Sequence, residues 1–234
     1  MNLLLITATP FESNILLQNL RAKRRVSPEC WQGKIGKHSA YLLTTGIGAL
    51  NTVFHLSCFL QRAKFDLILN AGICGSYDRK IPLCSVVEIV SETFCDLGAE
   101  DKNTWLPLRK LGFPLLRAKN GKLYYERLKN PYRSSTYVNK IPAPRPAASV
   151  TSDTVHGSRA SIARVKKYFS PQAENMEGGG VFFTGLREMV PFLEFRVVSN
   201  YVGVRNKKTW KLRESSRTIQ EFILNWIRLL PRRK

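Results

Sequence analysis

Side chains that could perform acid–base chemistry or bind a polar ligand are concentrated in four short segments of the 234-residue chain. The segments are residues 7–12, which end in Glu12, residues 70–76, residues 174–178 (Glu-Asn-Met-Glu-Gly) and residues 199–205, which begin with Ser-Asn. A carboxylate in such a segment can take a proton from water or accept hydrogen bonds from hydroxyl groups. A structural role is also open for Glu12, because the helix dipole favours a carboxylate near a helix N-terminus.

The elements that must position these segments can be predicted from the apolar pattern. Short apolar runs typical of buried strands occur at residues 3–7, 41–45, 66–70, 86–90 and 193–199. Helical spacing of apolar residues occurs at residues 49–63 and 219–230, and a further helix is expected from residue 11 or 12.

Strands that alternate with helices predict an α/β fold of three layers (α/β/α), with a mostly parallel central sheet. Ligands bind beyond the carboxyl ends of the strands in such sheets, and residues 7–12, 70–76 and 199–205 lie at these ends. The chain is expected to form one domain over residues 1–234. Residues 117–146 are basic, rich in proline and without periodicity, so they are expected to be an insertion or a mobile loop.

The cysteines and histidines do not form a recognisable ligand pattern. Five scattered cysteines without Cys-x-x-Cys spacing predict reduced thiols rather than a disulfide or zinc framework. His38 and His55 belong to no cluster, and no spacing of His, Asp and Glu suggests a metal site. We therefore expect neither a metal nor a cofactor.

The composition excludes several classes of protein. A hydrophobic fraction of 44% excludes a disordered chain, and the apolar runs are too short to span a membrane. No signal peptide is expected, because the N-terminus has neither a basic leader nor a cleavage site of small residues. The net charge of +20 is concentrated in residues 21–37, 117–145 and 203–234. No motif typical of nucleic-acid binding accompanies this charge, so no nucleic-acid partner is expected, although a positive surface can attract an anionic small substrate.

Four pieces of the sequence together resemble the nucleoside phosphorylase and nucleosidase superfamily. They are Ala8-Thr9-Pro10-Phe11-Glu12, Thr45-Gly46-Ile47-Gly48, Asn70-Ala71-Gly72-Ile73-Cys74-Gly75, and Glu174-Asn175-Met176-Glu177-Gly178 followed by Ser199-Asn200. Within the superfamily the sequence is most similar to the futalosine hydrolases. That similarity is carried by residues 174–178, by Arg196-Val-Val-Ser-Asn-Tyr-Val with Trp210 downstream, and by Val150-Thr151 with Thr154-Val155-His156-Gly157.

The resemblance implies hydrolysis of the N-glycosidic bond of futalosine, with release of hypoxanthine in an alternative route to menaquinone. It also implies a homo-oligomer, a dimer or larger, while the scattered cysteines predict a cytoplasmic location. Two alternatives remain open. One is a nucleosidase acting on methylthioadenosine, adenosylhomocysteine or aminodeoxyfutalosine. The other is a nucleic-acid or nucleotide binder on an inactive nucleosidase scaffold.

The resemblance also implies roles for the two carboxylates. Glu12 matches the residue that activates a water beneath the anomeric carbon, and Glu177 matches the residue that holds the ribose hydroxyls. Met176 would lie against the sugar face. The loop from Thr7 to Glu12 has neither the glycine nor the arginine of a phosphate cradle, which favours hydrolysis over phosphorolysis.

The remaining matches concern the base and the rest of the substrate. Asn200 matches an aspartate that protonates the purine in adenine-releasing relatives. An amide cannot supply a proton, so Asn200 favours a 6-oxopurine. A base or substrate pocket is expected from Ile73, Cys74, Val155, His156, Asn175 and Ser199. The cation expected to meet the benzoate tail of futalosine could be Arg205, His156 or a basic residue of 117–145.

Overall fold

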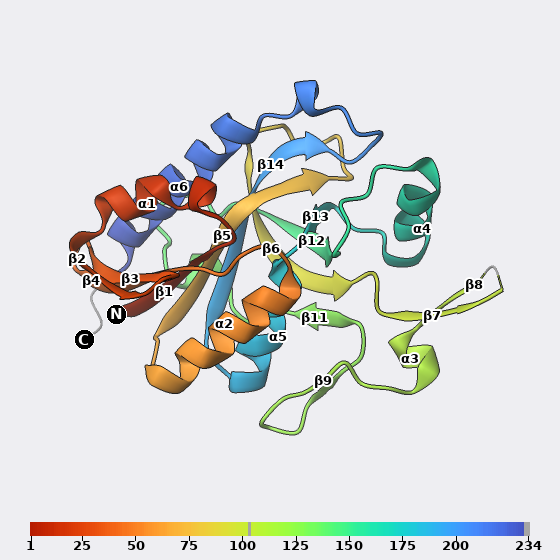
Figure 1. Ribbon diagram of the computed structural model, residues 1–234, viewed down its shortest axis with the longest axis horizontal. Helices are drawn as coiled ribbons and strands as arrows, with labels where there is room; N and C mark the ends of the chain where they lie inside the picture. The colour runs from red at the N-terminus through yellow and green to blue at the C-terminus, as the bar shows by residue number, and fades with distance from the viewer. Residues whose placement is uncertain (103, 232–234) are drawn as a thin grey trace.

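The computed structural model describes residues 1–102 and 104–231, which are built around a ten-stranded sheet (Figure 1). Nine of the strands follow one another in the order β11-β6-β12-β13-β5-β1-β4-β3-β2, and β14 pairs with both β5 and β6. These strands are β1 (Asn2–Thr7), β2 (Arg21–Ser27), β3 (Cys30–Ile35), β4 (His38–Thr44), β5 (Leu67–Ser76), β6 (Val86–Phe94), β11 (Arg127–Lys129), β12 (Arg145–Thr151), β13 (Ala173–Asn175) and β14 (Phe192–Tyr201).

The double pairing of β14 closes part of the sheet on itself. Strands β5, β14, β6, β12 and β13 are each hydrogen-bonded to the next, and β13 returns to β5. Two small hairpins lie outside this sheet. They are β7 (Gly98–Asp101) with β8 (Thr104–Pro107), and β9 (Leu116–Arg117) with β10 (Leu123–Tyr124).

Helices cover both faces of the sheet (Figure 1). The helix pair α1 (Asn14–Asn19) and α6 (Leu212–Leu229) packs on one face, and the pair α2 (Ala49–Arg62) and α5 (Gly178–Glu188) packs on the other. Each pair has its own apolar core: Trp226 and Phe195 belong to the core under α6, and Phe182 and Phe192 to the core under α5. The other helical segments described are α3 (Leu108–Leu111), α4 (Arg159–Phe169), η1 (Pro10–Glu12), η2 (Ser134–Thr136) and η3 (Lys207–Thr209).

The expected α/β fold is confirmed, but the sheet is mixed rather than mostly parallel. Strand β1 is parallel to β4 and β5, and β14 is parallel to β5, whereas β14 is antiparallel to β6 and β13 is antiparallel to β5. The consecutive strands β2, β3 and β4 form an antiparallel meander, because short turns can join only antiparallel neighbours.

Strand β5 continues through the residues that the sequence predicts as a turn. Its glycines provide room for neighbouring side chains rather than a change of chain direction. A Cβ placed on Gly72 would collide with the Arg196 guanidinium and would lie 2.9 Å from Glu12 Oε1. A side chain at this position is therefore incompatible with the two charged groups beside it.

The basic, proline-rich segment 117–146 contains regular structure that periodicity did not predict. Strand β11 pairs with β6, and Leu128 and Val138 are buried. The buried Ser134 donates to the Glu88 carboxylate from both its backbone N–H (2.9 Å) and its hydroxyl (2.6 Å). These contacts attach the segment to the edge of the sheet.

Candidate active site

One pocket of about 250 Å³ brings together all ten residues that the sequence singled out for the site. They come from five places in the fold: η1 after β1, the second half of β5, the loop after β12, the end of β13 with the residues after it, and the end of β14. These residues are Glu12, Ile73, Cys74, Val155, His156, Asn175, Met176, Glu177, Ser199 and Asn200.

Glu12 is held in the pocket wall by two hydrogen bonds. Its Oε1 accepts the backbone N–H of Ile73 at 3.0 Å, and its Oε2 accepts the Thr9 hydroxyl at 3.4 Å. Burial raises the pKa of Glu12, while the nearby Arg196 and the Ile73 N–H act in the opposite direction. A carboxylate with a raised pKa in a pocket is suited to accept a proton from water.

Glu177 lies at the N-terminus of α5. Its Oε1 accepts the backbone N–H of Gly48 at 3.1 Å, which fixes it against the turn that begins α2. Its Oε2 lies 3.6 Å from Arg196 Nη1. Glu177 is 7% exposed, so this carboxylate presents a small surface to the pocket.

A buried arginine connects the two carboxylates. Arg196 on β14 is 1% exposed, and its Nε donates to Glu194 Oε1 at 2.8 Å. Its Nη2 donates to Asn175 Oδ1 at 3.1 Å, and its Nη1 is the group close to Glu177. The attraction between Arg196 and Glu12 acts on the pKa values of both groups. The pocket therefore has a fixed positive group between two anions.

Asn175 is committed to the protein rather than to a ligand. Its Nδ2 donates to Glu92 Oε1 at 2.6 Å and to Ser149 Oγ at 2.9 Å. Its Oδ1 accepts the N–H groups of Glu177 (3.0 Å) and Gly178 (2.6 Å) as well as Arg196. All of its amide capacity is used, so Asn175 supports the site from behind.

His156 is bound to a carboxylate that also takes part in the pocket wall. Its Nδ1 forms a short hydrogen bond with Glu174 Oε2, and its backbone N–H donates to Glu174 Oε1 at 3.0 Å. Tyr77 donates its hydroxyl to the same Oε2 at 2.6 Å. His156 is 5% exposed, so it is a buried residue rather than an exposed loop histidine.

Ser199 and Asn200 lie at the end of β14. The Ser199 hydroxyl is 2.8 Å from Asn200 Oδ1 and 3.1 Å from the carbonyl oxygen of Cys74. When Ser199 donates to Oδ1, the Asn200 NH₂ group faces a ligand as a donor; one of its hydrogens also makes a long contact of 3.4 Å with the Tyr201 carbonyl oxygen. Cys74 is buried in the core under α5, and burial raises the pKa of its thiol to about 12, so it is not a nucleophile.

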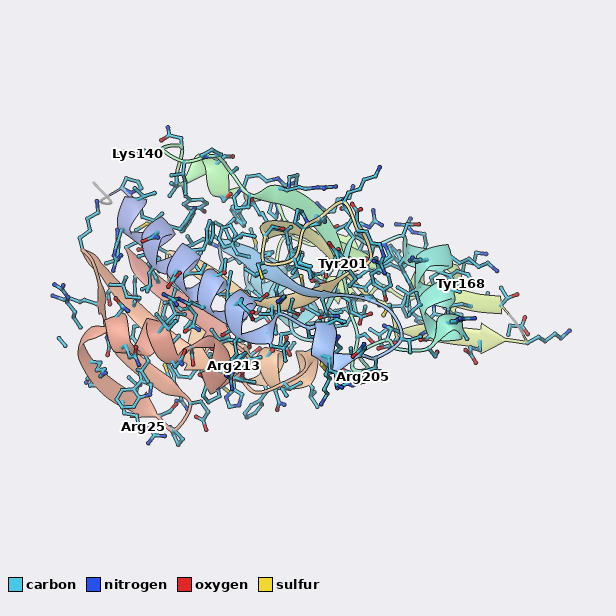
Figure 2. The ribbon with its side chains drawn as sticks, turned by 90° about the horizontal axis from the view of Figure 1, so that it is seen from above. Arg25, Lys140, Tyr168, Tyr201, Arg205 and Arg213 are labelled. Atoms are coloured by element: carbon cyan, nitrogen blue, oxygen red, sulfur yellow. The ribbon has the colours of Figure 1, made fainter. Side chains whose placement is uncertain are left out.

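The pocket wall also includes a cation and an aromatic ring that come from the segment after β14. The Arg205 guanidinium carbon lies 5.1 Å from the centre of the Trp210 ring, which is a cation–π arrangement. Both residues line the pocket, and Arg205 is exposed. Figure 2 shows Arg205 on the outer surface of the molecule. The residues found to line the pocket include none from 117–145.

Sequence reasoning missed the charged groups beneath the pocket. These groups are Glu92, Glu194 and Arg196, all in buried strands, together with the Glu174–Tyr77 contact. A signal was present, because Glu194 and Arg196 interrupt an otherwise apolar run in β14. A buried charge in a strand must be paired with an opposite charge or a hydrogen-bonding group. Two such charges in β14, a few residues before Ser199 and Asn200, therefore indicate that a charged cluster lies next to the site.

A small group of possible metal ligands lies beside the pocket. Cys95, Asp96 and His156 offer donor atoms within 4.8 Å of one another. However, His156 Nδ1 is bound to Glu174, and Asp96 already accepts from Ser152 at 2.7 Å. Burial and Asp96 raise the pKa of Cys95 to about 12. We therefore assign no metal to this group.

The fold and the pocket define a class of protein that comparison also identifies. A family model described as "Phosphorylase superfamily" matches residues 2–230, so the chain belongs to that superfamily and, through the relatives below, to its futalosine hydrolase branch. The chain is 31% identical to the futalosine hydrolase of Streptomyces coelicolor over 189 residues, which cover 74% of this chain and 72% of the relative. It is 28% identical to the futalosine hydrolase of Thermus thermophilus over 185 residues, which cover 79% of each.

Solved structures show the same fold at lower sequence identity. An S-adenosylhomocysteine nucleosidase from Streptococcus pyogenes superposes with a TM-score of 0.81, covering 99% of this chain and 98% of that one at 18% identity. A 5′-methylthioadenosine/S-adenosylhomocysteine nucleosidase from Colwellia psychrerythraea gives a TM-score of 0.83, with 98% and 96% covered at 18% identity. Within the described residues, no helix is long and apolar enough to cross a membrane.

Proposed function

We propose that this chain hydrolyses the N-glycosidic bond of futalosine and releases hypoxanthine, as a step toward menaquinone. The observation that carries the proposal is the pair of pocket carboxylates, Glu12 and Glu177, which both interact with the buried Arg196. Membership in the futalosine hydrolase family supports the choice of substrate.

The two carboxylates suit the two needs of nucleoside hydrolysis. The transition state resembles an oxocarbenium ion, so a water must be activated while positive charge grows on the sugar. Glu12 accepts the proton of that water. Glu177 accepts hydrogen bonds from the ribose hydroxyls, and these bonds strengthen as the ring becomes cationic. Met176 provides an apolar surface for the sugar between them.

Water is a better nucleophile than phosphate in this pocket. A phosphate ion would have to approach Glu12 and Glu177, and like charges repel strongly where solvent is excluded. Among the described residues, Arg196 interacts with both carboxylates, and it is already bound to Glu194 and Asn175. Its positive charge is therefore not free to bind a phosphate.

We assign recognition of the purine base to Asn200. Its NH₂ group can donate to N7 and O6 of a 6-oxopurine, which are both acceptors. The Ser199 hydroxyl supports this orientation by donating to Asn200 Oδ1. Val155, His156, Ile73 and Cys74 form the remaining walls around the base and sugar.

The proposal predicts release of hypoxanthine from futalosine in the absence of phosphate. Glu12→Gln should lower kcat about 100- to 10,000-fold while substrate still binds, because the amide keeps the shape but accepts no proton. In the wild type, kcat should fall as the pH drops through the raised pKa of Glu12, because the protonated carboxyl is no longer a base. Chromatography of the products with and without phosphate tests the reaction. Accumulation of the 1-phosphate of the tail-bearing sugar, or normal turnover by the variant, would refute it.

A second prediction concerns the choice of base. The wild type should prefer futalosine to aminodeoxyfutalosine about 5- to 150-fold in kcat/KM, because a 6-amino group places a donor against a donor and a mispaired buried polar group costs about 1–3 kcal/mol. Asn200→Asp should narrow or reverse this ratio, since a protonated aspartic acid can donate to N7 without requiring O6. Kinetics with both nucleosides on both proteins decides the point. An unchanged ratio in the variant would show that Asn200 does not read the base.

Arg205 is our candidate for the cation that meets the substrate carboxylate, because it lines the pocket and stacks on Trp210. Arg205→Gln should raise KM for futalosine about 10-fold or more, because a charge-assisted hydrogen bond is worth about 1.5–3 kcal/mol. The KM for inosine, which has no such tail, should stay nearly unchanged. Lys208→Gln, on the same segment, serves as the charge-matched control. Equal losses for both nucleosides would argue against this contact.

We also propose that the chain works as a single-domain homo-oligomer in the cytoplasm. Five free thiols support a reducing compartment.

An apolar surface supports association of the chain into an oligomer. Ile47, Leu50 and Phe54 are 57%, 83% and 63% exposed, and Leu50 also borders a second cavity of about 380 Å³. Ile47 lines the active pocket too, so a neighbour on this surface would border the substrate. Sedimentation equilibrium should show an oligomer that Leu50→Glu dissociates; a monomeric wild type would contradict this proposal.

A further inference from the structure

Two fully buried carboxylates face each other behind the active pocket. Glu92 on β6 and Glu194 on β14 are both 0% exposed. A Cβ placed on Gly178 would lie 2.6 Å from Glu194 Oε1 and 2.7 Å from Glu194 Oε2, and closer still to Glu92 Oε1. The two carboxylates therefore border the same small space under the first turn of α5.

The hydrogen bonds of the pair leave one oxygen without a well-placed donor. Glu92 Oε1 accepts from Asn175 and Glu92 Oε2 accepts the Thr151 hydroxyl at 2.8 Å, while Glu194 Oε1 accepts from Arg196. Glu194 Oε2 is buried without a hydrogen bond of ordinary geometry, although the Asn70 side chain, whose Nδ2 is likewise unpaired, interacts with this carboxylate. A buried carboxylate oxygen without a well-placed donor is costly, and a proton held between the two carboxyl groups would supply that donor.

The surrounding charges also call for a proton. Arg196 is the single cation among the groups that act on this pair, whereas Glu177 adds a third carboxylate. The other neighbours are neutral: Asn70, Thr151 and Asn175. Burial raises the pKa of both Glu92 and Glu194; the charge of Glu194 raises the pKa of Glu92 further, and the charge of Glu177 raises that of Glu194. Two adjacent carboxylates in a dry interior cannot both be ionised at low cost.

We propose that Glu92 and Glu194 share one proton at neutral pH and that Glu92 is a positioning residue for the active site. Through the shared proton, Glu92 remains a neutral or weakly charged acceptor for Asn175. Asn175 in turn holds the first N–H groups of α5 and the Arg196 guanidinium, and these set the position of Glu177. Loss of the proton places a second full charge beside Arg196 and draws the guanidinium away from Glu177.

The shared proton has a defined effect on stability. In the unfolded chain both glutamates are ionised above about pH 5, whereas the native pair retains a proton. Unfolding therefore releases a proton, and the equilibrium constant for unfolding rises about tenfold per pH unit until the native pair itself ionises. The stabilisation is complete at low pH and is lost as the pH rises through the native pKa.

Urea unfolding of the wild type and Glu92→Gln at several pH values from 5.5 to 8.5 tests the proton. Glutamine reproduces the neutral carboxyl, so the ratio of the two unfolding constants should change about tenfold per pH unit at the acid end of this range. Glu88→Gln is the matched control, because Glu88 is also buried on β6 but its carboxylate binds Ser134 rather than a group of the pair. A pH-independent ratio for Glu92→Gln, or the same slope for Glu88→Gln, overturns the shared proton.

Two further measurements complete the test. Carbon NMR of the glutamate carboxyl groups in the wild type should show the Glu92–Glu194 pair titrating above neutral pH, and this readout does not depend on the variant folding. The positioning role rests on the proposed function. In the wild type, kcat should fall at alkaline pH as the pair loses its proton and the guanidinium moves from Glu177; this alkaline fall should disappear in Glu92→Gln and persist in Glu88→Gln. If the stability and NMR results hold while futalosine is not cleaved, the proposed function fails and the shared proton stands. An unchanged alkaline fall in active Glu92→Gln overturns the positioning role.

Discussion

The arrangement of this molecule depends on one guanidinium held in a dry interior. Arg196 is almost completely buried, and a charge in that place is tolerated only when partners surround it. Glu194 from its own strand, Asn175 from β13 and Glu177 from α5 fill that requirement. Gly72 on β5 leaves the space that the guanidinium occupies. The electrostatic need of a single side chain thus brings three strands and a helix to one point.

Strands β5, β14, β6, β12 and β13 form a closed circuit of hydrogen-bonded neighbours, and this circuit explains how a buried cluster of charges can exist. Strand β14 lies between β5 and β6, so its side chains are enclosed by neighbouring strands instead of facing a helix alone. Charged groups within the circuit are shielded from water, which strengthens their mutual attraction and raises the cost of leaving any of them unpaired. The pocket lies at one end of this circuit. Its carboxylates therefore meet substrate in surroundings whose charge is already fixed.

The sequence predicted the parts of the site that depend on local signals. Apolar runs located β1, β4, β5 and β14, and the polar residues after them converge on the pocket as expected. The mixed sheet was not predictable, because the direction of β13 and β14 depends on pairing between residues far apart in the chain. Strand β2 is basic and exposed, so it has no apolar alternation to reveal it. Asn175 was assigned to the pocket wall, but its partners Glu92 and Arg196 lie in other strands, and only the fold shows that its amide faces them.

The closure of the circuit by β14 also has a consequence during synthesis of the chain. Residues up to about 190 can form most of the sheet, yet the facing edges of β5 and β6 then have no strand between them. Such edges are apolar and free to pair with other chains until the last strand arrives. Pairings across so much sequence form slowly, which prolongs the exposure. A nascent or truncated chain without β14 is therefore the form most prone to aggregate, and the appearance of a complete pocket marks the end of that vulnerable interval.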